Sequence, residues 1–202
     1  MNWFHRAGLN RARPWRQLVA MTNFIVLWAA LAASPNAELA DRPWELDLGL
    51  SGSLAADTRG LGGAASLAVS RRFFGWVRPL AGFGVGARGP GELLNLIRFG
   101  VRLELPWERS WRPFLGLAFA HNHETDFAHV RDAPLAAALG LSDHGTNHRS
   151  GLDTTLGVSV ALPSRPDAGA TGVAGVSASV AAMAGTGPVW TVALNAWVGL
   201  AF

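Results

Sequence analysis

The feature that most constrains this chain is a two-residue alternation between apolar residues and residues that are charged or glycine. In "NLIRFGVRLEL" every second residue from Ile97 to Leu105 is apolar. Between them stand Arg98, Gly100, Arg102 and Glu104. Because successive side chains of a β-strand point to opposite faces, this segment predicts a strand with one apolar and one charged face.

Eight segments with this alternation follow one another from residue 44 to the C-terminus. We expect strands at residues 44–57, 61–74, 77–88, 95–106, 111–124, 149–162, 172–184 and 189–202. A helical period competes in one place, where "DAPLAAALGLSD" predicts a short helix from about Pro134 to Leu141 inside the longest connection. The chain is therefore expected to form one all-β domain.

The alternation alone fits two kinds of architecture. A soluble sandwich or a lipocalin-like barrel turns its apolar face to a core and its charged face to water. A membrane barrel turns the same two faces to lipid and to the lumen. Other features of the sequence are needed to choose between them.

Three features favour the membrane barrel. Every second residue from Trp190 to Phe202 is apolar, so the last strand carries one apolar face to the end of the chain. Trp190 falls at one end of the strands, and four tryptophans fall at the other end, as in aromatic girdles: Trp44, Trp76, Trp107 and Trp111. The longest connection, about 24 residues between the fifth and sixth segments, lies on the external side if the first strand starts in the periplasm.

This architecture resembles the small eight-stranded outer-membrane barrels of bacteria, the OmpA-like and OmpX-like group. The resemblance covers residues 44–202 and is carried by the strand pattern and the C-terminal strand. It implies an antiparallel up-and-down transmembrane β-barrel with one long external loop, present as a monomer in the Gram-negative outer membrane. Lipid and lipopolysaccharide would then be its immediate partners.

The N-terminal segment is expected to be a secretory signal peptide covering residues 1–33. Four arginines precede an apolar stretch from Leu18 to Ala33, and a small-residue site predicts cleavage near Ala32. Residues 34–43 would then form a short N-terminal segment of the mature chain. An uncleaved anchor is the alternative, and it needs about 20 apolar residues.

Composition excludes two classes of function. The chain has no cysteine, so it forms neither disulfides nor thiolate metal sites. The formal net charge of +3 depends on the basic leader, because residues 17–202 hold 13 arginines and 14 acids, a net charge of −1. No nucleic-acid partner is expected of such a surface.

The alternation also places charged side chains of both signs inside the predicted barrel. They are Glu45, Asp47, Arg72, Arg78, Arg88, Arg98, Arg102, Glu104, Arg112 and Asp153. Eight strands leave an interior that side chains about fill, and unpaired buried charge is costly. We therefore expect an ion-paired plug and a non-porin protein.

All five histidines beyond the leader lie within one stretch of 28 residues. They are His121, His123, His129, His144 and His148. A hairpin would bring His121 and His123 together with His148, with Glu124 or Asp126 as an oxygen ligand, in a set that suits zinc or copper. His129 and His144 are further candidate ligands. The alternative is a hydrogen-bonded cap at the headgroup boundary with a structural role.

A second chemistry uses the same stretch. The segment His148-Arg149-Ser150 is similar to the His-x-Ser of PagL-type lipid A deacylases. That resemblance implies a serine esterase acting on lipid A, with Ser150 as the nucleophile and His148 as the base. No glutamate follows at a comparable place in this segment, so Glu124 or Asp126 would have to orient the base. A structural or binding role is the favoured interpretation, and the deacylase is the alternative.

Overall fold

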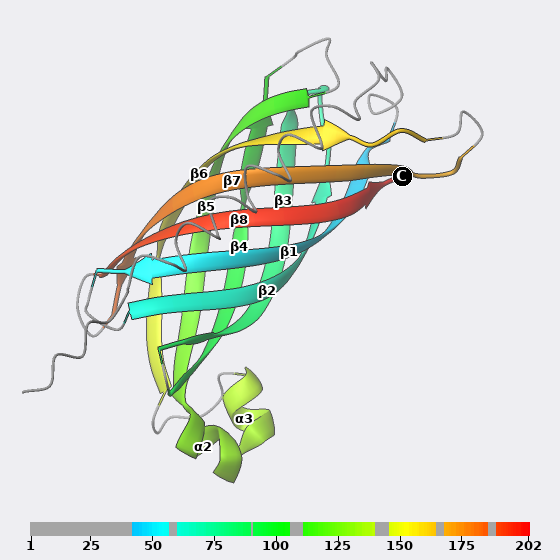
Figure 1. Ribbon diagram of the computed structural model, residues 1–202. Coiled ribbons are helices and arrows are strands. Elements are labelled where there is room, and N and C mark those ends of the chain that lie inside the picture. The colour runs from blue at the N-terminus through cyan, green and yellow to red at the C-terminus, as the bar shows by residue number, and fades with distance from the viewer. Residues whose placement is uncertain are drawn as a thin grey trace, which may run out of the picture.

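The eight strands and the closed barrel predicted from the alternation are confirmed. The computed structural model describes residues 42–56, 60–89, 91–105, 111–139, 146–164, 168–185 and 189–202. The strands are β1 (Trp44–Ala55), β2 (Gly60–Arg71), β3 (Val77–Arg88), β4 (Glu92–Glu104), β5 (Trp111–Asp126), β6 (Thr146–Ala161), β7 (Thr171–Ala184) and β8 (Val189–Ala201). Each pairs antiparallel with its neighbours in the chain, and β8 pairs with β1 (Figure 1).

The barrel has a near end and a far end. At the near end, the backbones of Trp44 and Phe202 exchange hydrogen bonds of 3.0 and 2.9 Å. Beyond the far end lie two short helices between β5 and β6, α2 (Phe127–Asp132) and α3 (Pro134–Leu139) (Figure 1). The structure describes no helix that is long and apolar enough to cross a membrane.

Three strand ends extend beyond the prediction because polar residues continue the ladders, whereas β2 ends at Arg71, three residues before its predicted end. β4 begins at Glu92, whose partner is Asp126 at the end of β5. β6 begins at Thr146, which pairs with Thr125. Cross-strand pairing holds these residues although they continue no hydrophobic pattern.

The connection after β5 holds more helix than predicted. α3 falls within the predicted range of 134–141, whereas α2 was not predicted. The carboxylate of Asp126 accepts a hydrogen bond of 2.8 Å from the backbone N–H of Ala128 and so caps α2. Residues 1–41, with the predicted signal peptide, and residues 140–145 lie outside the described residues. The external location of this connection stays a prediction.

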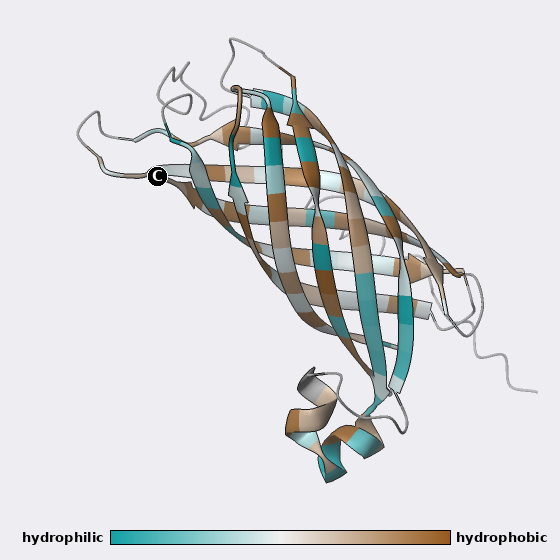
Figure 2. Ribbon diagram, turned by 180° about the vertical axis from the view of Figure 1, so that it is seen from behind, coloured by the Kyte–Doolittle hydropathy of each residue, from teal (hydrophilic) through white to brown (hydrophobic). Residues whose placement is uncertain are grey.

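The distribution of side chains is the reverse of that in a soluble protein. Leu50 on the outer wall is 70% exposed, whereas Arg78 inside is 0% exposed. Apolar and polar residues alternate along the strands, as Figure 2 shows. Exposed Trp44 and Trp76 lie at the near end and Trp190 at the far end. An apolar exterior around a charged interior is typical of barrels that span a membrane, and it excludes the sandwich and lipocalin-like alternatives.

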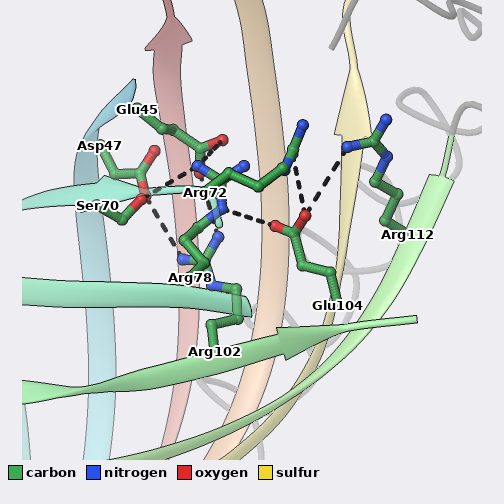
Figure 3. Close-up of polar contacts among 8 residues, drawn as sticks. All are labelled: Glu45, Asp47, Ser70, Arg72, Arg78, Arg102, Glu104 and Arg112. Atoms are coloured by element: carbon green, nitrogen blue, oxygen red, sulfur yellow. Dashed lines mark hydrogen bonds and ion pairs between the residues drawn. The ribbon is translucent and has the colours of Figure 1, made fainter. Parts of the chain in front are cut away.

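The near end of the lumen is filled by a cluster of four arginines and three acids (Figure 3). Arg78 lies at its centre, 3.2 Å from the Glu45 carboxylate and 2.9 Å from that of Glu104. Arg72 also binds Glu104, at 3.0 Å, and Arg112 lies 3.8 Å from it. Because these side chains come from four strands, with Arg72 just after β2, the cluster links the walls of the barrel.

Arg102 joins this cluster to an aromatic layer. Its guanidinium lies 3.1 Å from Glu45 and 3.5 Å from Asp47. The same group lies 4.7 Å from the ring centroid of Phe114 and 5.2 Å from that of Trp197. These distances are within the range of cation–π attraction, so the aromatic rings and the ion pairs hold one arginine in place.

Two further ion-paired layers lie along the lumen. Arg98 and Asp153 meet at 3.1 Å, and both line an internal cavity of about 130 Å³ on one side and one of about 30 Å³ on the other. Towards the far end, Glu124 binds Arg88 and Arg149. Every charged side chain predicted to face the lumen is engaged in one of these three layers.

Replacing Arg78 with alanine should destabilise the barrel strongly. The change leaves Glu45 and Glu104 buried with one cation fewer, and breaking a buried pair in this way costs about 3–5 kcal/mol. Urea titration of the protein folded into lipid vesicles measures the loss. The matched control is Arg131→Ala on the exposed surface of α2, expected to change stability by less than about 0.5 kcal/mol. Equal unfolding midpoints for the two variants would contradict the role given to Arg78.

Gly175 is expected to be required because Trp197 occupies the space of its side chain. A Cβ on Gly175 would overlap the Trp197 ring, whereas a Cβ on Gly63 meets its nearest heavy atom at 3.4 Å. Gly175→Ala should therefore cost about 1–3 kcal/mol, and Gly63→Ala much less. In a Trp197→Ala background the cost at Gly175 should disappear, which a double-mutant cycle of unfolding free energies tests. An undiminished cost there would refute the steric explanation.

Candidate functional site

Three histidines meet on the outer wall of the barrel near its far end. His121 and His123 lie two residues apart on β5 and therefore share a face. Across the ladder, His123 pairs with His148 on β6 and His121 pairs with Ser150. Phe119 and Leu152, the next pair on this face, are exposed on the apolar exterior. The register of one hairpin thus brings together residues that are far apart in the chain.

The three imidazoles contact one another directly. His121 Nε2 lies 2.7 Å from His123 Nε2. The ring centroids of His123 and His148 are 4.5 Å apart, and those of His121 and His148 are 5.8 Å apart. One nitrogen from each ring can be chosen so that all three lie within 4.8 Å of one another. Such convergence is what a shared metal ion requires.

Ser150 binds a different histidine from the one predicted. Its Oγ lies 2.6 Å from His121 Nδ1, its cross-strand partner, whereas the resemblance to lipid A deacylases assigned the base to His148. His148 is exposed and lies beside Ser150 along the same face of β6. Residues opposite each other on paired strands approach more closely than residues two apart on one strand, which explains the difference.

Helix α3 borders the site on the β4 side. Asn95 is the cross-strand partner of His123 on β4, and its side chain is buried. Its Nδ2 donates a hydrogen bond of 3.1 Å to the carbonyl oxygen of Ala137 in α3. His123 is 9% exposed, whereas His148 is open to the surroundings. A ligand would therefore approach from the side of His148.

Glu124 is not among the residues that converge with the histidines. It follows His123 on β5 and therefore points to the other face, into the lumen. There its carboxylate binds Arg88 and lies 3.1 Å from Arg149 Nε. Its prediction as a metal ligand is corrected by this placement, because the carboxylate is engaged by two arginines inside the barrel.

The remaining predicted ligands lie elsewhere. His129 is on α2 and does not belong to the group formed by His121, His123 and His148. Asp126, the second carboxylate considered for the base, caps α2. His144 lies outside the described residues. Three of the six predicted metal ligands therefore come together.

The arrangement has the chemistry of an open metal site. Three neutral imidazoles suit zinc, copper or nickel, and a tetrahedral ion would keep one position for water or another ligand. With metal–nitrogen distances of about 2.0–2.1 Å, ligand nitrogens lie about 3.3 Å apart. His121 Nε2 and His123 Nε2, now 2.7 Å apart, would have to separate by a few tenths of an ångström. Nitrogens as far apart as 4.8 Å would have to approach by about 1.5 Å, so binding requires rotation of the side chains.

Two features of the site were missed by the sequence analysis. The contact between Ser150 and His121 depends on the register of β5 and β6, which the alternation does not fix. The approach of α3 to Asn95 depends on how the connection folds back, and no motif signals it. The shared face of His121, His123 and His148 followed from strand parity and was predicted.

Comparisons with known proteins identify the fold. No family model matches the chain, and no curated protein matches it in sequence. Among solved structures, Neisserial surface protein A (NspA) is similar with a TM-score of 0.56 and 15% identity, covering 79% of this chain and 97% of NspA. The N-terminal barrel domain of Pseudomonas aeruginosa OprF matches with a TM-score of 0.42 and 10% identity, over 78% and 97% of the two chains. Ail of Yersinia pestis matches with a TM-score of 0.44 and 14% identity, over 80% and 99%. Together with the closed ring of eight strands, the likeness to NspA shows that this chain has the fold of the small bacterial outer-membrane barrels.

Proposed function

We propose that this protein is a small non-porin outer-membrane barrel that binds a divalent transition metal, such as zinc or copper, on its outer wall. The ligands are His121, His123 and His148. The observation that carries the proposal is the convergence of one nitrogen from each ring within 4.8 Å. Neutral imidazole is the commonest protein ligand for metals and suits zinc and copper.

The proposal includes a location and an orientation. Residues 1–33 direct export and are cleaved near Ala32, and the chain enters the outer membrane with its near end in the periplasm. The histidine site then lies at the external headgroup boundary, next to lipopolysaccharide. A closed barrel leaves no strand edge to be covered by a partner, which supports a monomer.

The ion-paired lumen supports the non-porin role. Three layers of charged side chains cross the interior, and the cavities between them are small. We expect the purified protein to give no porin-like current steps in a planar lipid bilayer, because bulk water has no continuous path. Stable conductance steps that persist after repurification would contradict this role.

Metal binding should depend on all three histidines. Calorimetric titration of the chelator-treated, refolded protein with Zn²⁺ and with Cu²⁺ should show one bound ion per chain. His148→Ala should weaken binding by more than the roughly 10–100-fold typical of changes outside the ligand set. His129→Ala, on α2, is the control and should bind as the unaltered protein does. Absence of binding in the unaltered protein, or equal affinity in both variants, would refute the site.

The second candidate is ester hydrolysis in the outer leaflet. It is favoured by the distance of 2.6 Å between Ser150 Oγ and His121 Nδ1, which makes His121 the base in place of His148. His123, at 2.7 Å from the other nitrogen of His121, would orient it. Acyl release from lipid A should then be lost in Ser150→Ala and kept in His148→Ala. Unchanged release in Ser150→Ala would dismiss this candidate.

A further inference from the structure

Both ring nitrogens of His121 are engaged. Nδ1 lies 2.6 Å from Ser150 Oγ, and Nε2 lies 2.7 Å from His123 Nε2. A neutral imidazole has one nitrogen that donates a hydrogen bond and one that accepts. The two contacts therefore jointly decide which nitrogen of His121 carries the proton.

The nitrogen of His121 that carries the proton differs between the metal-free and the metal-bound state. Without metal, one hydrogen lies between Nε2 of His121 and Nε2 of His123. His121 supplies this hydrogen when the hydroxyl of Ser150 donates to its Nδ1. With metal, the Nε2 lone pairs of His121 and His123 are both needed for the ion. His121 must then carry its proton on Nδ1, and that N–H needs an acceptor at its present position.

We infer that Ser150 is a positioning residue of the metal site, which accepts the hydrogen bond from Nδ1–H of His121 when Nε2 of that ring binds the ion. This inference rests on the proposed metal-binding function. A hydroxyl both donates and accepts, so Ser150 serves His121 in both states by turning its O–H. A carboxylate or a backbone carbonyl accepts only, and it would serve the metal-bound state alone.

The surroundings of Ser150 support this role. The residue lies on the outer wall, where its neighbours along the face of β6 are His148 and the exposed Leu152. Its cross-strand partner on β7 is Ala184, which has no polar side-chain atom, and its partner on β5 is His121. A hydroxyl on an apolar surface is costly unless it is hydrogen-bonded. The hydrogen bond to His121, and not packing, therefore explains why a serine stands at this position.

The test compares two variants of nearly identical shape. Ser150→Thr keeps the hydroxyl and Ser150→Val lacks it, and both β-branched residues suit a strand. Ser150→Val should bind Zn²⁺ about 10–100-fold more weakly, as is typical when the hydrogen-bond partner of a metal-bound histidine is removed. Ser150→Thr should restore most of the affinity. Calorimetry of the refolded full-length protein measures both.

A spectroscopic readout separates positioning from a structural effect. In the zinc-loaded protein with ¹⁵N-labelled histidine, NMR should show His121 protonated at Nδ1 and bound through Nε2. In Ser150→Val the Nδ1–H of bound His121 loses its acceptor, so its proton signal should shift or broaden through faster exchange, while the strand signals remain. Equal zinc affinity in the Val and Thr variants would overturn the inference, and so would an unaltered Nδ1–H signature in Ser150→Val.

Failure of the proposed metal site can be distinguished from failure of the role given to Ser150. If the unaltered protein binds no Zn²⁺, the metal site itself is refuted, and the inference falls with it. If it binds and Ser150→Val binds equally well, the site stands and the role of Ser150 is refuted. Loss of acyl release from lipid A in Ser150→Val, with unchanged zinc affinity, would overturn the inference in favour of a nucleophile.

Discussion

The pairing of β1 with β8 is the constraint on which the rest of the structure depends. It closes the sheet, so strand backbone groups find partners within the ring and none of the eight strands is left as an edge. A closed ring has two faces and no other place for a strand side chain. Each residue of the alternation is therefore committed either to the exterior or to the lumen.

Closure also explains why the charged residues are inside and why they come from many strands. Arg78 of β3 reaches Glu45 of β1 and Glu104 of β4, and Arg102 of β4 reaches Glu45 as well. A slip of one residue in any of these ladders would move its charges to the apolar face. The ion pairs thus fix the register of the barrel while they close its interior.

The sequence predicted which face of a strand each residue occupies. It did not predict which residues of neighbouring strands lie opposite each other. Period-two alternation was sufficient for the eight strands, the charged lumen and the shared face of His121, His123 and His148. The same parity places Glu124 inside, yet its closeness to His123 in the sequence favoured it as a ligand. The contact of Ser150 with His121 required knowing which residues of β5 and β6 are opposite, and the polar ends of these strands hide that from a hydrophobic pattern.

The two kinds of strand pairing differ in how far apart their partners lie along the chain. His123 and His148 belong to one hairpin, whereas Glu45 and Ala201 join nearly opposite ends of the described chain. Because loop-closure entropy grows with the length of the enclosed segment, the β5–β6 hairpin costs less entropy to close than the β1–β8 seam. The three converging histidines lie on this hairpin, so bringing their side chains together requires only local closure of the chain. The histidine cluster and the seam thus differ in the entropic cost of closure, although both belong to one sheet.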